Sequence, residues 1–470
     1  MEKLLIFTES KVNSQLSGLN KLLEPINNLD SWANKTIKTS FLAYQLNRLL
    51  TKVNLTSSLL QKVTFYLFLF SATAIFVSLS LPQFASDRFG IGIEVLVFSL
   101  FFLFYLLTNK AIAFKFNFID FLIIIFMLIL TISTFNSYFF KESLSGLFKY
   151  ITYICWYFSI KTLLLNSSRK ILLYFFSILF LSSIIVSLIG LYQYAIGVEP
   201  LATWEDMAQE NIHTRIYSTL GNPNLLCGYL LLIFPIGIVL STIPKNLLLK
   251  ALMIFSNLII LLAISLTGSR GGYIGLISII IFGALALFNY FLSKNQKVNK
   301  LQTIIALVFM IGSIASVFFL FPVVIERLQT LCSLRDHSSN NYRVNVWLSS
   351  LQMLKDNWVF GIGPGNNAFF HAYGLYMKSG FDALAAYNIF LEIGVETGFL
   401  GILIFIFIFI FSFLKLHFIF FNRNQILGLG IACSLIGLLA HGIFDTVFYR
   451  PQLFIPFWFL LASIDKIEEN

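Results

Sequence analysis

Long apolar runs, separated by short polar segments, dominate the chain from residue 62 onward. A helix needs about 17 to 25 residues of this kind to cross a bilayer, and the runs repeatedly reach that length. They are continuous in Leu, Ile and Phe, without the alternation of apolar and polar residues that is typical of strands in a membrane barrel. The pattern therefore predicts an all-α polytopic membrane protein.

We expect about 12 transmembrane helices, with a large exoplasmic loop between the ninth and the tenth. The candidate spans are residues 63–81, 91–108, 117–135, 147–165, 171–197, 224–243, 251–267, 273–293, 302–325, 388–415, 426–448 and 452–464. The last of them is short, and Lys161 weakens the fourth. Residues 1–61 form a basic N-terminal segment, residues 62–466 form the transmembrane domain, and residues 326–387 form the exoplasmic loop within it.

Composition supports this class and excludes others. Of the 470 residues, 58% are hydrophobic and only 11% are charged, which is too apolar for a soluble domain. The formal net charge is +10, but the basic residues are scattered over short loops, so we predict no nucleic-acid partner. The four cysteines show no CxxC spacing, and we predict no metal site, no disulfide framework and no cofactor.

Loop charges orient the helices, because cytoplasmic loops of membrane proteins are enriched in Lys and Arg. With the N-terminus inside, the inner loops carry Lys110, Lys115, Arg169, Lys170, Lys245, Lys250, Lys294, Lys297, Lys300, Lys415 and Arg423, and the outer short loops carry only Arg88, Lys141, Arg270 and Arg450. We therefore place the protein in the plasma (inner) membrane with both termini in the cytoplasm. The first 61 residues lack the pattern of a cleaved signal peptide.

Four arginines, Arg215, Arg270, Arg343 and Arg450, fall on the outer side near the ends of spans. Arg270 stands in "TGSRGGY", where we expect the glycines to leave backbone N–H groups open beside the guanidinium at the start of a helix. Such a place suits an oxyanion, and we predict that the four arginines bind an anion or a diphosphate. The alternative is that each arginine extends singly to lipid headgroups.

A polar stripe interrupts the tenth span. Asn388, Glu392 and Glu396 are four residues apart, so they lie on one helical face, which must point into protein or water rather than lipid. Glu392 is the candidate for contact with an outer arginine. That contact would either belong to a site or be a structural ion pair.

Two further outer segments carry polar groups. "HGIFDTVFYRPQ" places His441 and Asp445 near the outer end of the eleventh span as supporting site candidates, with an Asp445–Arg450 ion pair as the structural alternative. In "GNPN" we expect Asn222 and Asn224 to cap the next span rather than to bind a ligand.

The exoplasmic loop contains two recognisable patterns. An amphipathic helix is indicated by apolar residues at helical spacing, namely Val344, Trp347, Leu348, Leu351 and Leu354. "GIGPGNN" is glycine-rich but lacks the lysine and the strand–helix setting of a phosphate loop, so we expect a tight turn toward the membrane.

Six segments together resemble the O-antigen ligase and polymerase superfamily of membrane proteins. They are "GNPNLLCGYLL" (221–231), "TGSRGGYIGL" (267–276), "YRVNVW" (342–347), "GIGPGNNAF" (361–369), "AYNIFLEIGVETGFLG" (386–401) and "AHGIFDTVFYRPQ" (440–452). Within the superfamily they are most similar to the cyanobacterial branch of the IctB type, whose members are named inorganic-carbon (bicarbonate) transporters. The resemblance covers residues 62–466.

The resemblance also implies a site. Ligases of the superfamily carry a His followed by Asn, Ser or Gln, nine further residues and GxxG; here Asn388 fits this spacing, but the histidine position is Tyr387. In the ligases that histidine is thought to act as the base on an acceptor sugar, while outer arginines hold the diphosphate of the donor. Tyr, with a pKa of about 10, is a poor base near neutral pH, so we assign no catalytic residue. His371 and His441 are candidates to replace it, although such lone histidines are more often structural.

Three functions fit these patterns. The first is transport of bicarbonate, in which the outer arginines attract a small anion and the polar stripe lines its path. The second is a membrane glycosyltransferase, an O-antigen ligase-like enzyme that uses a polyprenyl-diphosphate-linked glycan donor. The third is a non-catalytic membrane partner that binds a lipid-linked glycan or another subunit. The missing motif histidine argues against the second, and the crowding of polar residues at one face argues against the first.

Overall fold

The computed structural model describes residues 28–36, 58–81, 90–109, 114–199, 215–293 and 338–469 of the chain. Every regular element in this part of the chain is a helix, which confirms the all-α class. The expected ninth span, residues 302–325, and the first part of the exoplasmic loop lie outside the described residues. Each of the other eleven expected spans coincides with a helix, and the total of 12 stays a prediction.

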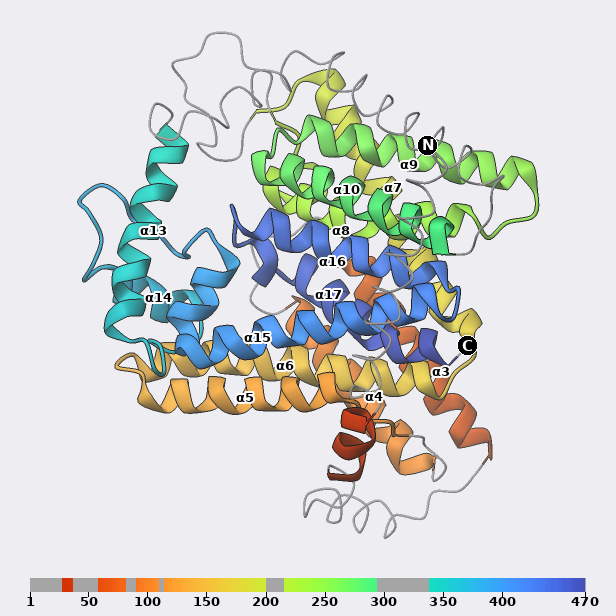
Figure 1. The fold of residues 1–470 in the computed structure, drawn as a ribbon, viewed down its shortest axis with the longest axis horizontal. Coiled ribbons are helices and arrows are strands. Elements are labelled where there is room, and N and C mark those ends of the chain that lie inside the picture. The colour runs from red at the N-terminus through yellow and green to blue at the C-terminus, as the bar shows by residue number, and fades with distance from the viewer. Residues whose placement is uncertain are drawn as a thin grey trace, which may run out of the picture.

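The bundle consists of eleven described helices (Figure 1). They are α3 (Ser58–Ser78), α4 (Gly90–Thr108), α5 (Phe118–Asn136), α6 (Phe140–Leu165), α7 (Arg169–Ile196), α8 (Pro223–Ser241), α9 (Leu247–Leu266), α10 (Arg270–Ser293), α15 (Ile389–Phe421), α16 (Ile426–Gly442) and α17 (Pro451–Glu468). Seven of them, α3, α5, α7, α8, α9, α10 and α15, are long and apolar enough to cross a membrane. The apolar parts of α4 and α16 are shorter, and α6 and α17 contain charged residues.

Asparagine marks the start of four of these helices. The side chains of Asn117, Asn222, Asn246 and Asn388 accept hydrogen bonds from the first N–H groups of α5, α8, α9 and α15. Pro223 follows Asn222 at the first helical position, where no intrahelical hydrogen bond is lost. Caps of this kind define where a helix begins, because the first N–H groups of a helix have no partner within it.

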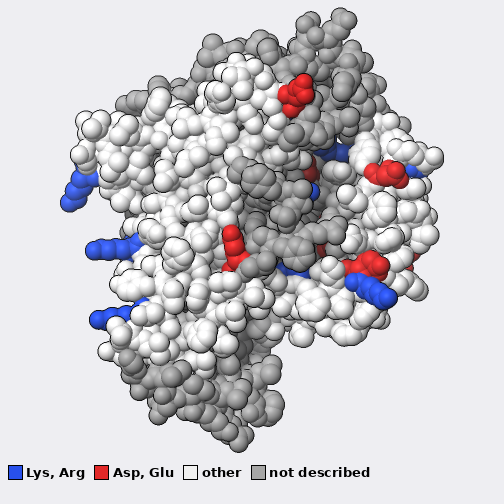
Figure 2. Space-filling view, turned by 180° about the vertical axis from the view of Figure 1, so that it is seen from behind, with Lys and Arg blue, Asp and Glu red and all other residues white. Residues whose placement is uncertain are grey.

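Successive helices run in opposite directions within α3–α10 and within α15–α17, so their connections gather at two ends (Figure 1). One end carries the turns at 215–222 and 443–450 together with α13 (Ser338–Asp356) and α14 (Asn366–Tyr373). We call it the arginine end, because all four predicted arginines lie there. The opposite end carries the exposed Lys170, Lys245 and Arg423, and Figure 2 shows Lys and Arg side chains projecting from one edge of the molecule. The cytoplasmic placement of that end stays a prediction.

The helix α13 runs across the arginine end, roughly at right angles to α5, α6 and α15 (Figure 1). Together with α14 it surrounds a small hydrophobic core, whose members are Val346, Met353, Ile362, Phe369, Ala372, Tyr373, Ala383, Ala386 and Val395. Because Val395 belongs to α15, this core fastens the α13–α14 unit to the bundle.

Four charged side chains form a buried network near the opposite end. Lys161 Nζ lies 2.5 Å from Asp120 Oδ2 and 2.6 Å from Asp465 Oδ2. Lys415 Nζ lies 2.8 Å from Asp465 Oδ1. All four side chains are buried and come from α5, α6, α15 and α17, so one network joins four helices.

Neighbouring groups complete this network. Lys415 Nζ also lies 2.9 Å from Asp30, in the short helix that precedes α3. Asn117 donates hydrogen bonds to both carboxylate oxygens of Asp465 at 2.8 Å. Lys161 was expected to weaken the fourth span, and Lys415 was expected to lie in an inner loop. The placement of Lys415 was wrong, because it lies within α15. Both lysines lie inside the bundle because acidic partners on other helices neutralise them.

Removal of one member leaves a charged partner buried, which typically destabilises a protein by about 3 to 5 kcal/mol. We therefore expect Lys161→Met to lower the midpoint of thermal unfolding of the purified protein in detergent. Lys170→Met changes an exposed lysine at the same end and should stay within about 0.5 kcal/mol of the parent. Equal midpoints for the two variants would contradict a structural role of the network.

Candidate functional site

Arg215 lies against the turn between α9 and α10. Its Nε donates to the carbonyl oxygen of Thr267 at 2.7 Å, and its Nη2 donates to Oδ1 of Asn224 at 2.6 Å. Gly268, with φ of +60°, makes this approach possible, because a Cβ there would lie 3.3 Å from Cγ and Nε of Arg215. The guanidinium is thereby fixed between α8 and the α9–α10 turn.

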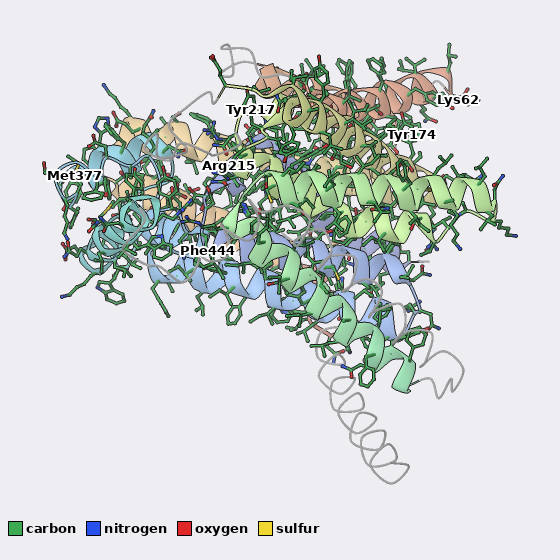
Figure 3. The ribbon with its side chains drawn as sticks, turned by 90° about the horizontal axis from the view of Figure 1, so that it is seen from above. Lys62, Tyr174, Arg215, Tyr217, Met377 and Phe444 are labelled. Carbon is green, nitrogen blue, oxygen red and sulfur yellow. The ribbon has the colours of Figure 1, made fainter. Side chains whose placement is uncertain are left out.

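Asn224 and Asp445 connect Arg215 to Arg343. Asn224, in the first turn of α8, donates from Nδ2 to Asp445 Oδ2 at 2.6 Å, and the same oxygen lies 3.9 Å from Arg343 Nη2. The structure thus connects two of the four arginines to one buried carboxylate, Arg343 directly and Arg215 through Asn224. In Figure 3, Arg215 and Phe444 lie where α13 and α14 meet the bundle. The ion pair considered for Asp445 forms with Arg343 and not with Arg450.

The stretch "TGSRGGY" packs α10 against α8 and α16. A Cβ at Gly271 would lie 3.1 Å from the carbonyl oxygen of His441, and a Cβ at Gly272 would overlap a side chain of α8. Ser269 Oγ accepts the N–H of Gly272 at 3.2 Å. The glycines therefore serve close helix packing, and the N–H of Gly272 is capped rather than open to an oxyanion as expected. Arg270 is half-buried at the start of α10.

Tyr387, at the position of the motif histidine, lies beside these arginines. Its carbonyl oxygen accepts the indole N–H of Trp347 at 3.3 Å, and its ring contacts that of Tyr342 with centroids 5.6 Å apart. Asp445 and Arg343 both act on its hydroxyl electrostatically. Its φ is +50°, a left-handed backbone that a bulky residue rarely adopts, and such strain is found mainly at functional sites.

Burial raises the pKa of the Tyr387 phenol above its ordinary value of about 10. Tyr342 raises this pKa further, whereas Arg343 lowers it. The phenol is therefore protonated at neutral pH. It can donate a hydrogen bond to a ligand, but it is unsuited to take a proton from a sugar hydroxyl.

Asn388 attaches the start of α15 to the turn that carries Asp445. Its Oδ1 accepts the N–H groups of Phe390 and Leu391 at 3.0 Å each. Its Nδ2 donates to the carbonyl oxygen of Ile443 at 3.0 Å. The first member of the polar stripe therefore holds the motif position and Asp445 close together.

The two glutamates of the stripe bind the folded-back chain. Glu392 accepts the N–H of Ala386, and Glu396 accepts the N–H of Gly365 at 2.7 Å and the hydroxyl of Tyr150 at 2.9 Å. Both side chains are buried. The expected contact between Glu392 and an arginine is not found in the part of the chain that the structure describes. The reason is that backbone N–H groups of the preceding segment already satisfy these carboxylates.

The "GIGPG" loop, residues 361–365, docks on the start of α15. Ile362 and Gly363 donate from N–H to the carbonyl oxygens of Val395 and Glu396 at 2.8 Å and 3.1 Å. The three glycines of the loop have φ between +70° and +113°, a conformation that favours glycine. The N–H groups of this loop are thus engaged by protein, as in a tight turn, and do not form a phosphate cradle.

Three other predicted residues lie at the arginine end with different neighbours. His441 is buried among α8, α10 and α16, with Nε2 3.4 Å from Ser269 Oγ. His371 is exposed on α14 and stacks on Phe139, with ring centroids 5.6 Å apart. Arg450 is exposed at the start of α17, and its electrostatic neighbours are on α6. Of the three, only His441 adjoins the Arg215–Arg343 site.

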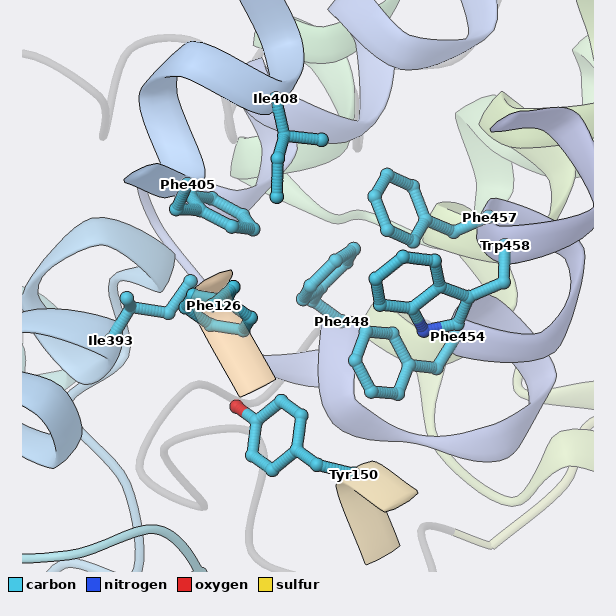
Figure 4. A pocket seen from close by; sticks show the side chains of 9 residues that line it. All are labelled: Phe126, Tyr150, Ile393, Phe405, Ile408, Phe448, Phe454, Phe457 and Trp458. Atoms are coloured by element: carbon cyan, nitrogen blue, oxygen red, sulfur yellow. The ribbon is translucent and has the colours of Figure 1, made fainter. Parts of the chain in front are cut away.

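Between the glutamates and the buried ion network, the bundle encloses an apolar region. Figure 4 shows a pocket there, lined by Phe126, Tyr150, Ile393, Phe405, Ile408, Phe448, Phe454, Phe457 and Trp458. Apart from Tyr150 and Trp458, these side chains are pure hydrocarbon. An anion that moved past Glu396 would therefore meet no charged partner in this pocket.

Two members of the site were missed in the sequence. Asn224 was expected to cap α8, but Asn222 alone does so, by accepting the N–H groups of Asn224 and Leu225. The side chain of Asn224 instead bridges Arg215 and Asp445. Tyr342 was not considered, although it directly precedes a predicted arginine, because no pattern distinguishes it from other aromatic residues.

Comparison with known families gives one finding. Residues 255–406 match the family model described as O-Antigen ligase. The matched part runs from α9 into α15 and includes Arg270, Arg343 and Tyr387, whereas Arg215 and Asp445 lie outside it. No curated protein matches the chain. The match covers about a third of the chain and makes that part similar to the O-antigen ligase family, and the apolar helices indicate a membrane protein; neither finding supports the bicarbonate-transporter branch.

The docking of the loop can be tested at one glycine. A Cβ at Gly363 would overlap Ser137 and Ser143, whereas a Cβ at Gly380, which also has positive φ, would meet nothing within 4 Å. We expect both alanine variants to lose about 1 kcal/mol to backbone strain, and Gly363→Ala to lose about 1 to 3 kcal/mol more. Thermal unfolding and limited proteolysis would measure this. Equal losses would show that the loop is not held as described.

Proposed function

We propose that the protein is an O-antigen ligase-like membrane protein that binds a polyprenyl-diphosphate-linked glycan at the arginine end. One observation carries the proposal: Arg343 lies 3.9 Å from Asp445 beside Tyr387, and Arg215, far away in the chain, is linked to the same carboxylate through Asn224. The family match at residues 255–406 supports the substrate class, because it contains the motif position and two of the arginines.

The charges of the site favour a diphosphate. Among the described residues, Arg215, Asn224, Asp445 and Arg343 form one connected group, and Arg270 lies at the same end of the bundle. Guanidinium groups bind phosphate oxygens through paired, charge-assisted hydrogen bonds. The attraction between guanidinium groups and phosphate is strongest in a site shielded from water. We expect such shielding here, because the site lies where the helices of the bundle, α13 and the turn at 443–450 meet.

Transfer of the glycan would use the same charges. An acceptor hydroxyl attacks the anomeric carbon, the bond from that carbon to the diphosphate breaks, negative charge grows on the departing diphosphate, and the hydroxyl proton passes to that diphosphate or to water. Arginines already in place stabilise this charge in the transition state. Tyr387 supports the step as a hydrogen-bond donor only, because its phenol stays protonated.

The protonated phenol also favours a second candidate function, which is binding of the lipid-linked glycan without transfer. Transport of bicarbonate, the remaining possibility, is not favoured, because the pocket next to Glu396 is lined mainly by hydrocarbon. A direct assay of transfer together with binding separates the two candidates.

Arg343 offers the sharpest test of binding. Loss of a hydrogen bond to a charged group typically costs about 1.5 to 3 kcal/mol, so we expect Arg343→Gln to weaken binding of a polyprenyl-diphosphate glycan roughly 10- to 100-fold. Binding would be measured on protein in lipid nanodiscs. Arg423→Gln, which changes an exposed arginine at the opposite end, is the matched control and should bind like the parent. Unchanged binding in Arg343→Gln would refute the proposal.

Tyr387 tests the transfer step. In Tyr387→His an imidazole, with an ordinary pKa of about 6.5, stands at the motif position, and its neutral form is a competent base. We therefore expect glycan transfer by this variant to exceed that of the parent and to rise with pH between about 5 and 7. Tyr387→Phe has no base and is the control. Faster transfer by the parent than by Tyr387→His would mean that the phenol itself serves the reaction.

A further inference from the structure

The helix α13 presents two different faces. One face carries Arg343 and Trp347, which contact Asp445 and the carbonyl oxygen of Tyr387. The other carries Val344, Leu348, Leu351 and Lys355, spaced four, three and four residues apart, and we call these four residues the α13 stripe. Leu348 is 48% exposed and Leu351 is 52% exposed, so the described residues leave this stripe largely uncovered.

The stripe continues into the outer surface of the bundle. The chain leaves α13 at Asp356, and the next aromatic residue, Trp358, is 61% exposed. Its carbonyl oxygen accepts the N–H of Phe399 at 2.7 Å. Phe399 and Leu400 are themselves exposed on α15, which is long and apolar enough to span the membrane. Exposed apolar side chains therefore lie on α13, on the segment that follows it and on the membrane-spanning helix to which that segment is bonded.

The depth of this surface follows from α5. The carbonyl oxygen of Glu396, three residues before Phe399, accepts the hydroxyl of Ser133 at 2.5 Å. Ser133 lies in the last turn of α5, which ends at Asn136. Trp358 and Phe399 are thus level with the end of a spanning helix, where the hydrocarbon of a bilayer gives way to headgroups.

The direction and composition of α13 fit the same place. It runs across the ends of α5, α6 and α15 rather than along them, as expected of a helix that lies along the membrane surface (Figure 1). Apolar residues on one side, a lysine that can extend to headgroups and a neighbouring tryptophan are typical of a helix lying in the bilayer interface.

We infer that the α13 stripe and Trp358 lie in the boundary between headgroups and acyl chains of the bilayer, and that this contact holds Arg343 at the depth of the lipid phosphates. The partner of the exposed face is phospholipid, not a second protein. A consequence is that a lipid-linked anion reaches Arg343 by moving within the plane of the membrane. The inference rests on the apolar surface alone and stands whether or not the protein transfers glycans.

Spin labels on the full-length protein test this placement. In a variant without Cys155, Cys227, Cys332 and Cys433, Leu351→Cys would be labelled and reconstituted into vesicles of phosphatidylethanolamine and phosphatidylglycerol. We expect the label at 351 to collide with oxygen, which concentrates in acyl chains, at least about threefold more than with a water-soluble nickel chelate. Gln352→Cys is the matched control, because Gln352 is exposed and lies about 100° around the helix from Leu351. A label at 352 should collide more with the chelate than with oxygen.

Every other outcome overturns the inference. Equal collision with the chelate at 351 and 352 would place the stripe in water. Low collision with both reagents at 351 would mean that protein covers it, either a second copy or another chain. If the cysteine-free variant does not fold, brominated lipids provide the same test. They should quench the fluorescence of the natural protein more than that of Trp358→Phe, and equal quenching would overturn the inference.

Discussion

In the hydrocarbon region of a membrane, a polar or charged side chain is stable only where the protein supplies its partner. The helix α15 carries such side chains at both of its ends. At one end Glu392 and Glu396 precede Gly398, whose φ of +72° interrupts the helix. The N–H of Phe399 then donates to Trp358 instead of to the helix, which leaves the carbonyl oxygen of Val395 for the N–H of Ile362. At the other end Lys415 enters the buried ion network. Much of the bundle is arranged around these two requirements.

The interruption at Gly398 also determines the shape of the site. Because the "GIGPG" loop takes up the carbonyl groups that the helix releases, residues 338–388 are folded back over the arginine end rather than extending away from it. This brings Arg343 to Asp445 and fixes Tyr387 at the first turn of α15. The position of Arg343 therefore depends on the interruption of α15 at Gly398 and on the docking of the loop there.

The sequence predicted where the helices lie, but not which side chains of different helices contact one another. Hydrophobic runs located the spans, and asparagines marked helix starts, because both signals are local. The polar stripe was expected to face protein or water; Glu392 and Glu396 are buried in protein, and the partner of Glu392 is a backbone N–H rather than an arginine. Lys161 and Asp465 are far apart in the chain, and no periodicity links them. Asn224 was misjudged for the same reason, since its role depends on residues from other helices.

The two ends of the bundle differ in how closely their charged side chains are paired. This difference is the reason to place the functional site at the arginine end. Near the opposite end, Lys161 and Lys415 meet acidic side chains at hydrogen-bonding distance, so the network is self-sufficient and has a structural role. At the arginine end, the nearer guanidinium nitrogen of Arg343 is 3.9 Å from Asp445, and Arg215 meets the same carboxylate only through Asn224. A looser pair of this kind can exchange part of its contact for a phosphate oxygen, whereas the buried network would lose more than it gained. The lipid-linked anion that we propose as the ligand would bind by such an exchange.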